Sequence, residues 1–190
     1  AARKYFTVAY ECFTGKRKNE PKFNPEAFDR KALSPVMIML STAQTMRAID
    51  TEKKDFYHTI AKDCLDEILH GGFLKENALL ECVNSDGTFS DTPSGRVVNP
   101  GHSMEAAWFV MTEGILTDNK EAIEAGKKII DITLPHGWDE KNGGLIAFTD
   151  VSGKPPVQLE WDMKLWWPQC ETMIALRLAH TVFKDEKYLK

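Results

Sequence analysis

The feature that most constrains the fold of this chain is a pattern of paired helices that repeats together with its loops. An amphipathic segment over 53–70 leads into Gly71-Gly72, and a second over 119–133 is followed by Gly143-Gly144, seventy-two residues later. A short apolar run and a further turn glycine come after each pair. A repeat of this size, built on helical hairpins, indicates that each unit buries its apolar face against its neighbours.

The two helices of each pair differ in how their apolar residues are distributed. Segment 35–50 is apolar nearly all round in its first turns, which is typical of an inner, buried helix, whereas 53–70 alternates apolar and charged positions as an outer helix does. Segments 100–116 (inner) and 119–133 (outer) repeat this order, and further helices are predicted over 2–13 and 168–183. The pattern predicts an all-α chain, one domain over 1–190, with short β-hairpin loops between helices, in either a closed α/α toroid or an open solenoid.

Composition excludes some classes of partner. With 43% hydrophobic and 27% charged residues and a net charge of −4, the chain is typical of a globular domain and has no basic surface for nucleic acid or an anionic membrane. No apolar run approaches the roughly 20 residues of a membrane span. The four cysteines are scattered without paired spacing. We therefore expect reduced thiols, no metal site and a cytoplasmic location.

The first candidate for chemistry is the segment Asn99-Pro-Gly-His-Ser-Met-Glu105. Asn99 is a good N-cap and Pro100 suits the first helical position, so His102 and Glu105 should share one face of a helix start. The partial positive charge there disfavours imidazolium, which predicts a lowered pKa and a neutral base at His102. The alternatives are a structural histidine within the helix hairpin, and a Glu105 that only satisfies helix-end amides.

The second candidate is Leu159-Glu-Trp-Asp-Met-Lys-Leu-Trp-Trp-Pro-Gln-Cys-Glu171. Pro168 can open a helix, which places Glu171 one turn in, where an acidic residue also stabilises a helix by default. Trp166 and Trp167 are adjacent and face different ways, so one should pack in the core while the other lines a pocket, although both could be core residues. Trp161 and Asp162 are equally ambiguous. Imidazole, carboxylates and indoles together indicate a carbohydrate site that moves protons.

Both segments resemble the signatures of the N-acylglucosamine 2-epimerase family, which includes a renin-binding protein. The similarity continues through Ser34-Pro-Val-Met-Ile-Met-Leu40, Ala106-Ala-Trp-Phe109 and His136-Gly-Trp-Asp-Glu-Lys-Asn-Gly-Gly-Leu145, and covers essentially the whole chain. The resemblance implies an (α/α)6 barrel, of which six helices would be about half. Because members of the family are about twice as long, and both ends of this chain read as interrupted helices, the resemblance implies a central fragment.

The resemblance also implies a reaction, the interconversion of N-acetyl-D-glucosamine and N-acetyl-D-mannosamine by proton exchange at C2. In it His102 would be one of two catalytic histidines, Glu105 would contact the substrate or orient the histidine, and Glu171 would help to open the sugar ring. Trp166, Trp167 and Asp162 are then candidate substrate contacts. The chemistry needs neither a redox cofactor nor a metal.

Further expectations follow from the same resemblance. The second catalytic histidine would lie beyond Lys190, so we expect the 190 residues alone to be a poor catalyst. An incomplete ring exposes apolar inner-helix surface, which favours association, and a homodimer is one form of it. Some members respond to ATP as an effector that is not consumed. The basic loop 14–24 is a weak candidate for a phosphate contact, and a solvated loop is the simpler interpretation.

Three other functions remain open from the sequence. Aldose–ketose isomerases and cellobiose 2-epimerases share the His-x-x-Glu element of His102 and Glu105. Glycoside hydrolases on an α/α toroid use paired carboxylates, for which Glu105 and Glu171 are candidates. A non-catalytic sugar- or protein-binding module is the third alternative.

Overall fold

The computed structural model describes residues 1–20 and 29–189 of the chain. Its six α-helices are α1 (Ala2–Phe13), α2 (Leu33–Ile49), α3 (Lys54–His70), α4 (Pro100–Thr117), α5 (Lys120–Gly137) and α6 (Trp166–Phe183), with short 3-10 turns η2 (Thr51–Lys53) and η3 (Glu186–Leu189). Four short strands join them: β1 (Arg30–Ala32), β2 (Cys82–Asn84), β3 (Val97–Val98) and β4 (Thr149–Asp150). All six predicted helices are confirmed, each with ends within four residues of the prediction.

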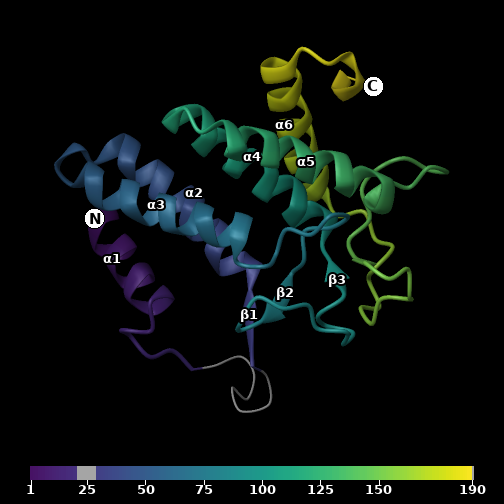
Figure 1. The fold of residues 1–190 in the computed structure, drawn as a ribbon, viewed down its shortest axis with the longest axis horizontal. Helices are drawn as coiled ribbons and strands as arrows, with labels where there is room; N and C mark the ends of the chain where they lie inside the picture. Colours follow the sequence, from purple (N-terminus) through teal and green to yellow (C-terminus); the bar gives the residue numbers. More distant parts are fainter. Residues whose placement is uncertain (21–28, 190) are drawn as a thin grey trace.

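The helices form an inner and an outer row (Figure 1). Helix α4 contacts both α2 and α6, so these three form the inner row, while α3 packs on α2 and α5 packs on α4. Helix α1, the first helix of the chain, packs against α2. The predicted order of inner and outer helices is therefore confirmed. Helix α4 is buried on several sides, as its nearly uniform apolar sequence requires.

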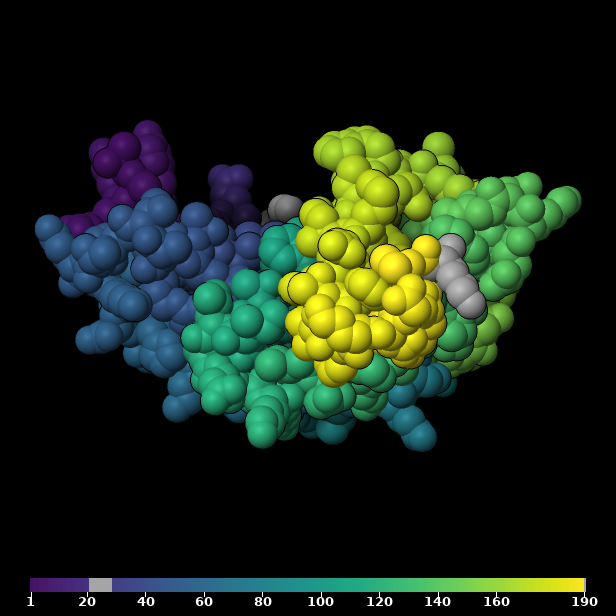
Figure 2. All heavy atoms as spheres, turned by 90° about the horizontal axis from the view of Figure 1, so that it is seen from above, coloured from purple at the N-terminus to yellow at the C-terminus, as the bar shows by residue number. Residues whose placement is uncertain are grey.

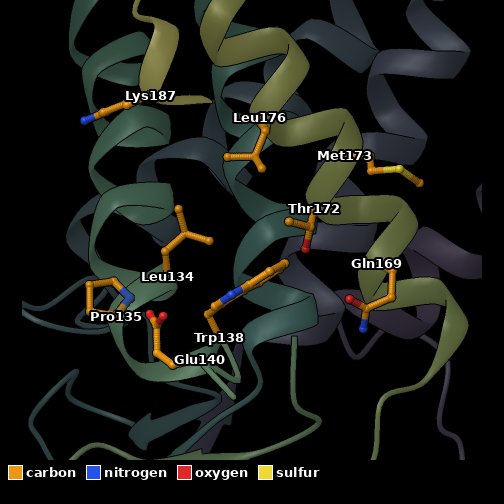
Figure 3. A pocket seen from close by; sticks show the side chains of 9 residues that line it. All are labelled: Leu134, Pro135, Trp138, Glu140, Gln169, Thr172, Met173, Leu176 and Lys187. Carbon is orange, nitrogen blue, oxygen red and sulfur yellow. The ribbon is translucent and has the colours of Figure 1, made fainter. Parts of the chain in front are cut away.

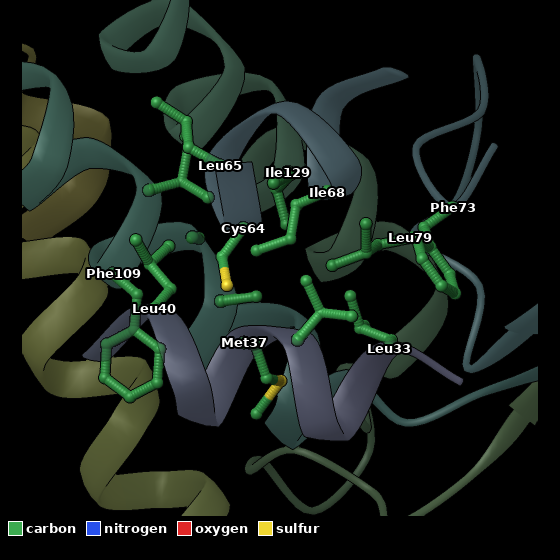
Figure 4. Close-up of a cluster of buried hydrophobic side chains, with 14 of the residues drawn as sticks. Leu33, Met37, Leu40, Cys64, Leu65, Ile68, Phe73, Leu79, Phe109 and Ile129 are labelled. Carbon is green, nitrogen blue, oxygen red and sulfur yellow. The ribbon is translucent and has the colours of Figure 1, made fainter. Parts of the chain in front are cut away.

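The hydrophobic core lies between the two rows (Figure 4). Leu33, Met37 and Leu40 from α2 face Cys64, Leu65 and Ile68 from α3, joined by Phe73, Leu79, Phe109 and Ile129 from the neighbouring loop and helices. Full burial of each large apolar side chain stabilises the fold by roughly 1.5–3 kcal/mol. Burial also raises the pKa of the Cys64 thiol to about 12, so this cysteine acts as a small protonated core residue.

The short strands repeat in the same way as the helices. Strand β1, before α2, pairs antiparallel with β2, after α3; strand β3, before α4, pairs antiparallel with β4, after α5. An isolated antiparallel bridge follows each outer helix: Leu74 pairs with Leu79 just after Gly71-Gly72, and Trp138 pairs with Leu145 around Gly143-Gly144. Gly72 has a φ of +98°, and a Cβ there would lie 2.1 Å from the carbonyl oxygen of Gly87. Gly72 therefore allows a close backbone contact with Gly87 under the first helix hairpin, and Gly143 and Gly144, both at positive φ, form the turn after the second.

The starts of α4 and α6 place the candidate residues. The Asn99 side chain accepts a hydrogen bond from the His102 backbone N–H at 3.1 Å, which confirms the predicted cap of α4. Helix α6 begins at Trp166, and the prediction that Pro168 opens it was wrong by two residues. Proline is accommodated in that first turn because the N–H groups of a first turn have no partner within the helix.

A buried ion pair joins the inner helices α2 and α4. Arg47 on α2 donates two hydrogen bonds of 2.7 Å to the two carboxylate oxygens of Glu113 on α4. The Gln44 amide donates to the same carboxylate and to the carbonyl oxygen of Phe109. Both charges are thus satisfied within the helix interface, which fixes how α2 and α4 lie against each other.

Parts of the surface bear on the remaining predictions. Seen from above, the molecule is hollowed between α1 and the yellow-green segment that leads into α6 (Figure 2). Large apolar side chains are exposed on this segment and on α6, among them Leu159, Trp161, Met163, Trp166, Met173 and Ile174. Association through apolar surface stays a prediction.

Residues 14–20 of the basic loop are mostly exposed, and residues 21–24 lie outside the described residues. None of the described helices has the length and apolar character needed to cross a bilayer.

Candidate active site at the start of helix α4

The centre of the site is a contact between His102 and a carboxylate that precedes it in the chain. The Nδ1 atom of His102 lies 3.0 and 3.1 Å from the two carboxylate oxygens of Glu81, the residue directly before β2. The Glu81 backbone is held on both sides, since its N–H donates to the Val97 carbonyl and its carbonyl accepts from the Leu33 N–H. A single backbone segment therefore connects the starts of α2 and α4 and carries the partner of His102.

An indole from helix α6 covers the imidazole. The ring centroids of His102 and Trp167 are 5.4 Å apart and the planes are tilted by 37°. Gly101 makes this approach possible: a Cβ there would lie 2.7–2.9 Å from Trp167 ring atoms and the Pro168 Cβ. The glycine of the Asn-Pro-Gly-His segment is therefore required by packing between helices, because any larger residue would push Trp167 away from His102.

Two further carboxylates follow in the site: Glu105 acts on His102, and Glu171 acts on Glu105. Glu105 follows one turn later on α4 and is half-buried. Glu171 on α6 accepts a hydrogen bond of 2.7 Å from the indole N–H of Trp108 on α4. The Trp108 bond fixes the orientation of the Glu171 carboxylate and ties α6 to α4. The structure thus brings together four predicted site residues, His102, Glu105, Trp167 and Glu171.

The pKa of His102 is shifted in the direction opposite to the prediction. Burial lowers the pKa of His102, but the hydrogen bond that the ring donates to Glu81 and the negative charges of Glu81 and Glu105 outweigh burial, so the pKa is raised. The predicted lowering by the helix N-terminus was wrong because a carboxylate in direct contact acts more strongly than the partial charge of a helix end.

The carboxyl group of Glu105 is shifted as well. Burial raises the pKa of Glu105, and the negative charge of Glu171 raises it further, while His102 acts in the opposite direction. Glu105 is the sixth residue of α4, beyond the first turn, and the Asn99 side chain bonds to the His102 N–H. A capping-box role for Glu105 is therefore not the arrangement found.

The other predicted contacts lie on the surface. Trp166 is 78% exposed and Asp162 is also exposed, unlike the half-buried Trp167. The two adjacent tryptophans therefore face different ways, as predicted. The loop that carries Asp162 is held by an ion pair between Lys164 and Asp139, and the Gln169 side chain bonds to both backbone groups of Leu145.

Sequence reasoning missed two members of the site. Glu81 follows the buried pair Leu79-Leu80, and an acidic residue at the end of an apolar run before a strand is a signal of a partnered carboxylate, although a weak one. In the sequence, Trp108 belongs only to the family-like segment Ala106-Ala-Trp-Phe109 and has no predicted role in the site. Its half-buried position on an inner helix pointed to a partner for the indole N–H, but nothing in the sequence identified Glu171 as that partner.

A separate cavity lies on another face of α6 (Figure 3). It has a volume of about 650 Å³ and lies between α5, α6 and η3. Leu134, Trp138, Met173 and Leu176 give it apolar walls, and the Trp138 indole extends across it toward α6. None of the predicted site residues lines this cavity. Over residues 1–20 and 29–189, no group of three His, Cys, Asp or Glu residues is arranged to hold a metal ion.

Comparison with known proteins gives consistent matches in sequence and structure. Residues 11–190 match the model of the N-acylglucosamine 2-epimerase family. The mouse N-acylglucosamine 2-epimerase is 35% identical over 154 residues, which is 80% of this chain and 37% of the mouse protein. The chain therefore spans well under half the length of the curated relatives it matches.

Solved structures show the same fold at lower identity. A D-mannose isomerase aligns with a TM-score of 0.72 at 20% identity, over 85% of this chain and 42% of that one. The cellobiose 2-epimerase of Spirochaeta thermophila aligns with a TM-score of 0.59 at 16% identity, over 98% of this chain and 51% of that one. The predicted fold class is confirmed: the helices form about half of an (α/α)6 barrel. By the match over residues 11–190, this chain belongs to the N-acylglucosamine 2-epimerase family.

Proposed function

We propose that these residues form the central part of an enzyme that interconverts N-acetyl-D-glucosamine and N-acetyl-D-mannosamine, with His102 as one of its acid–base groups. The observation that carries the proposal is the half-buried imidazole of His102, paired with Glu81 and covered by Trp167. The contact with Glu81 raises the pKa of His102 above its ordinary value of 6.5, which makes the imidazole a stronger base for taking a proton.

The reaction starts from the open-chain aldehyde of the sugar, whose carbonyl acidifies the hydrogen on C2. His102 takes that proton: the C2–H bond breaks, an N–H bond forms, and the electron pair moves through C2–C1 to the carbonyl oxygen. A second acid–base group returns a proton to the opposite face of C2, and the aldehyde re-forms with inverted configuration. That second group is expected from parts of the protein outside these residues, so the 190-residue chain alone should turn over poorly.

The neighbouring side chains suit the other steps. Trp167 offers an aromatic face for the C–H face of a sugar. Glu105, whose pKa is raised by burial and by Glu171, holds a proton more readily than an ordinary glutamate, which suits proton transfer to a sugar oxygen during ring opening. Glu171, oriented by Trp108, is the second candidate for this step.

The test is exchange of the C2 hydrogen of N-acetylmannosamine in heavy water, followed by NMR, with the protein from the complete reading frame. His102→Asn should reduce exchange by about 10²–10⁴-fold, while His136→Asn, at an exposed position late in α5, should not. Turnover that survives His102→Asn would contradict the proposal. A ketose product would indicate an aldose–ketose isomerase, inversion at C2 of cellobiose would indicate a cellobiose 2-epimerase, and reducing sugar released from oligosaccharides would indicate a hydrolase. Sugar binding without any turnover would indicate a binding module.

A further inference from the structure

Glu81 is the charged residue in closest contact with His102, and it comes from a different part of the chain. It lies twenty-one residues before His102, and both of its carboxylate oxygens are within hydrogen-bond distance of Nδ1. Its side chain is 15% exposed and that of His102 is 26% exposed. When the ring is protonated, an ion pair with this little water around it is screened much less than a surface pair.

The position of Glu81 is set independently of its side chain. Its backbone N–H donates to Val97, whose strand leads into the cap of α4, and its carbonyl accepts from Leu33 at the start of α2. The preceding Leu80 is fully buried. The carboxylate therefore starts from a backbone that is fixed relative to the first turn of α4, so little conformational freedom remains to be lost when it meets His102.

The imidazole is held from its other sides as well. Asn99 fixes the His102 backbone N–H, and Trp167 lies against the ring. An ionised carboxylate only accepts hydrogen bonds, so the proton of the shared bond belongs to Nδ1. This leaves the second ring nitrogen, Nε2, as the atom that is free to exchange a proton with a bound molecule.

We propose that Glu81 is the positioning residue of the site: it holds His102 as the tautomer with the proton on Nδ1, and it stabilises the imidazolium that forms when Nε2 takes a proton. This inference rests on the proposed function of His102. Glu81 does not touch the substrate in this scheme and acts only through the histidine. The titratable groups that act on His102 are Glu81, next to β2, and Glu105, on α4 itself, and both favour the charged ring.

The decisive variant is Glu81→Gln, which keeps the shape of the side chain and removes its charge. We expect the pKa of His102 to fall, because the buried ring keeps its desolvation cost and loses its main stabilising charge. The acid limb of the kcat/KM profile should then move to lower pH, and kcat/KM should fall by roughly 10- to 100-fold, as for carboxylates that orient metal-bound histidines. Glu81→Asp keeps the charge, so the pKa of His102 should fall less than in Glu81→Gln.

Nitrogen NMR of His102 gives a readout that needs no substrate. In the parent protein the ¹⁵N shifts should show a protonated Nδ1 and an unprotonated Nε2 above the pKa, and Glu81→Gln should lower the titration midpoint. Glu76→Gln, the same change at an exposed position five residues earlier, should leave the midpoint unchanged. An unchanged midpoint in Glu81→Gln, or a ring protonated on Nε2, would overturn the inference even if the protein epimerises sugars. A lowered midpoint without sugar turnover would confirm the pair and leave only the proposed function refuted.

Discussion

Helix α4 has an acid–base pair near each end, and the two pairs differ in every property that matters for chemistry. Near the C-terminal end, Arg47 donates two bonds of 2.7 Å to Glu113, and these side chains are only 9% and 1% exposed. Near the N-terminal end, His102 meets Glu81 at 3.0 Å, with 26% and 15% exposed. One pair is sealed between two helices, and the other retains access to solvent.

The contrast shows how the same class of contact can serve structure or reaction. Arginine stays charged at every pH a protein encounters, so its pair with Glu113 has a single state and fixes two helices. Histidine changes charge within the range of pH that proteins encounter, so its pair with Glu81 has two charge states, with the ring neutral or protonated. Burial keeps the Arg47–Glu113 pair in one charge state, while partial exposure gives protons and a small molecule access to the His102–Glu81 pair.

The largest effect is expected from breaking the structural pair with Glu113→Ala. Removal of one partner leaves the Arg47 guanidinium buried without its main acceptor, which costs about 3–5 kcal/mol of unfolding free energy. Urea denaturation followed by circular dichroism measures the loss. The double variant Arg47→Met with Glu113→Leu removes both charges and should recover most of the stability. A loss below about 1 kcal/mol would show that this pair is no more structural than the one at His102.

An intermediate effect is expected from Gly101→Ala. The new Cβ would lie within 2.7–2.9 Å of Trp167 and Pro168 atoms, so helix α6 must shift, at a cost of about 1–3 kcal/mol. The His102–Glu81 pair should be disturbed while the Arg47–Glu113 pair is not. Thermal unfolding and the chemical shifts of His102 measure the two consequences. Adding Trp167→Phe, which removes the clashing ring atoms, should restore part of the stability lost in Gly101→Ala. If the double variant is no more stable than Gly101→Ala, the contact with Trp167 is not the cause of the loss.

The smallest effect on stability is expected from Glu171→Gln, which sharpens the comparison within the site. Gln can still accept the Trp108 bond, but the negative charge that raises the pKa of Glu105 is gone, so that pKa should fall while burial keeps it above its ordinary value of 4.5. Carbon NMR of the Glu105 carboxyl measures this. Trp108→Phe keeps the Glu171 charge and should leave the Glu105 pKa raised; an unchanged Glu105 pKa in Glu171→Gln would mean that burial alone sets it.

The same pKa shifts predict how stability depends on pH. Folded His102 and folded Glu105 both hold a proton more tightly than they would in the unfolded chain, because both pKa values are raised. For His102 the stabilisation is fully present below about pH 6.5 and is lost as the pH rises through the folded value. For Glu105 stability likewise decreases as the pH rises from the unfolded to the folded value.

Features of the fold and the site could be predicted from the sequence where the interacting residues lie close together along the chain. Helix periodicity, the glycine pairs and the Asn99 cap are local, and all were predicted because each depends on residues within a few turns of one another. The start of α6 was misplaced because a proline in the first helical turn is tolerated at more than one position. The pKa of His102 was predicted with the wrong sign because its controlling charge, Glu81, comes from another segment.

The sequence by itself determined the order of inner and outer helices, the residues at the start of α4 and the family to which the chain belongs. Only the tertiary structure decided that Glu81 binds His102, that Trp108 holds Glu171, and that Trp167 rather than Trp166 covers the imidazole. Periodicity and capping act along the chain and can be read from neighbouring residues. Hydrogen bonds and charges act through space, and their partners are set only when the helices pack.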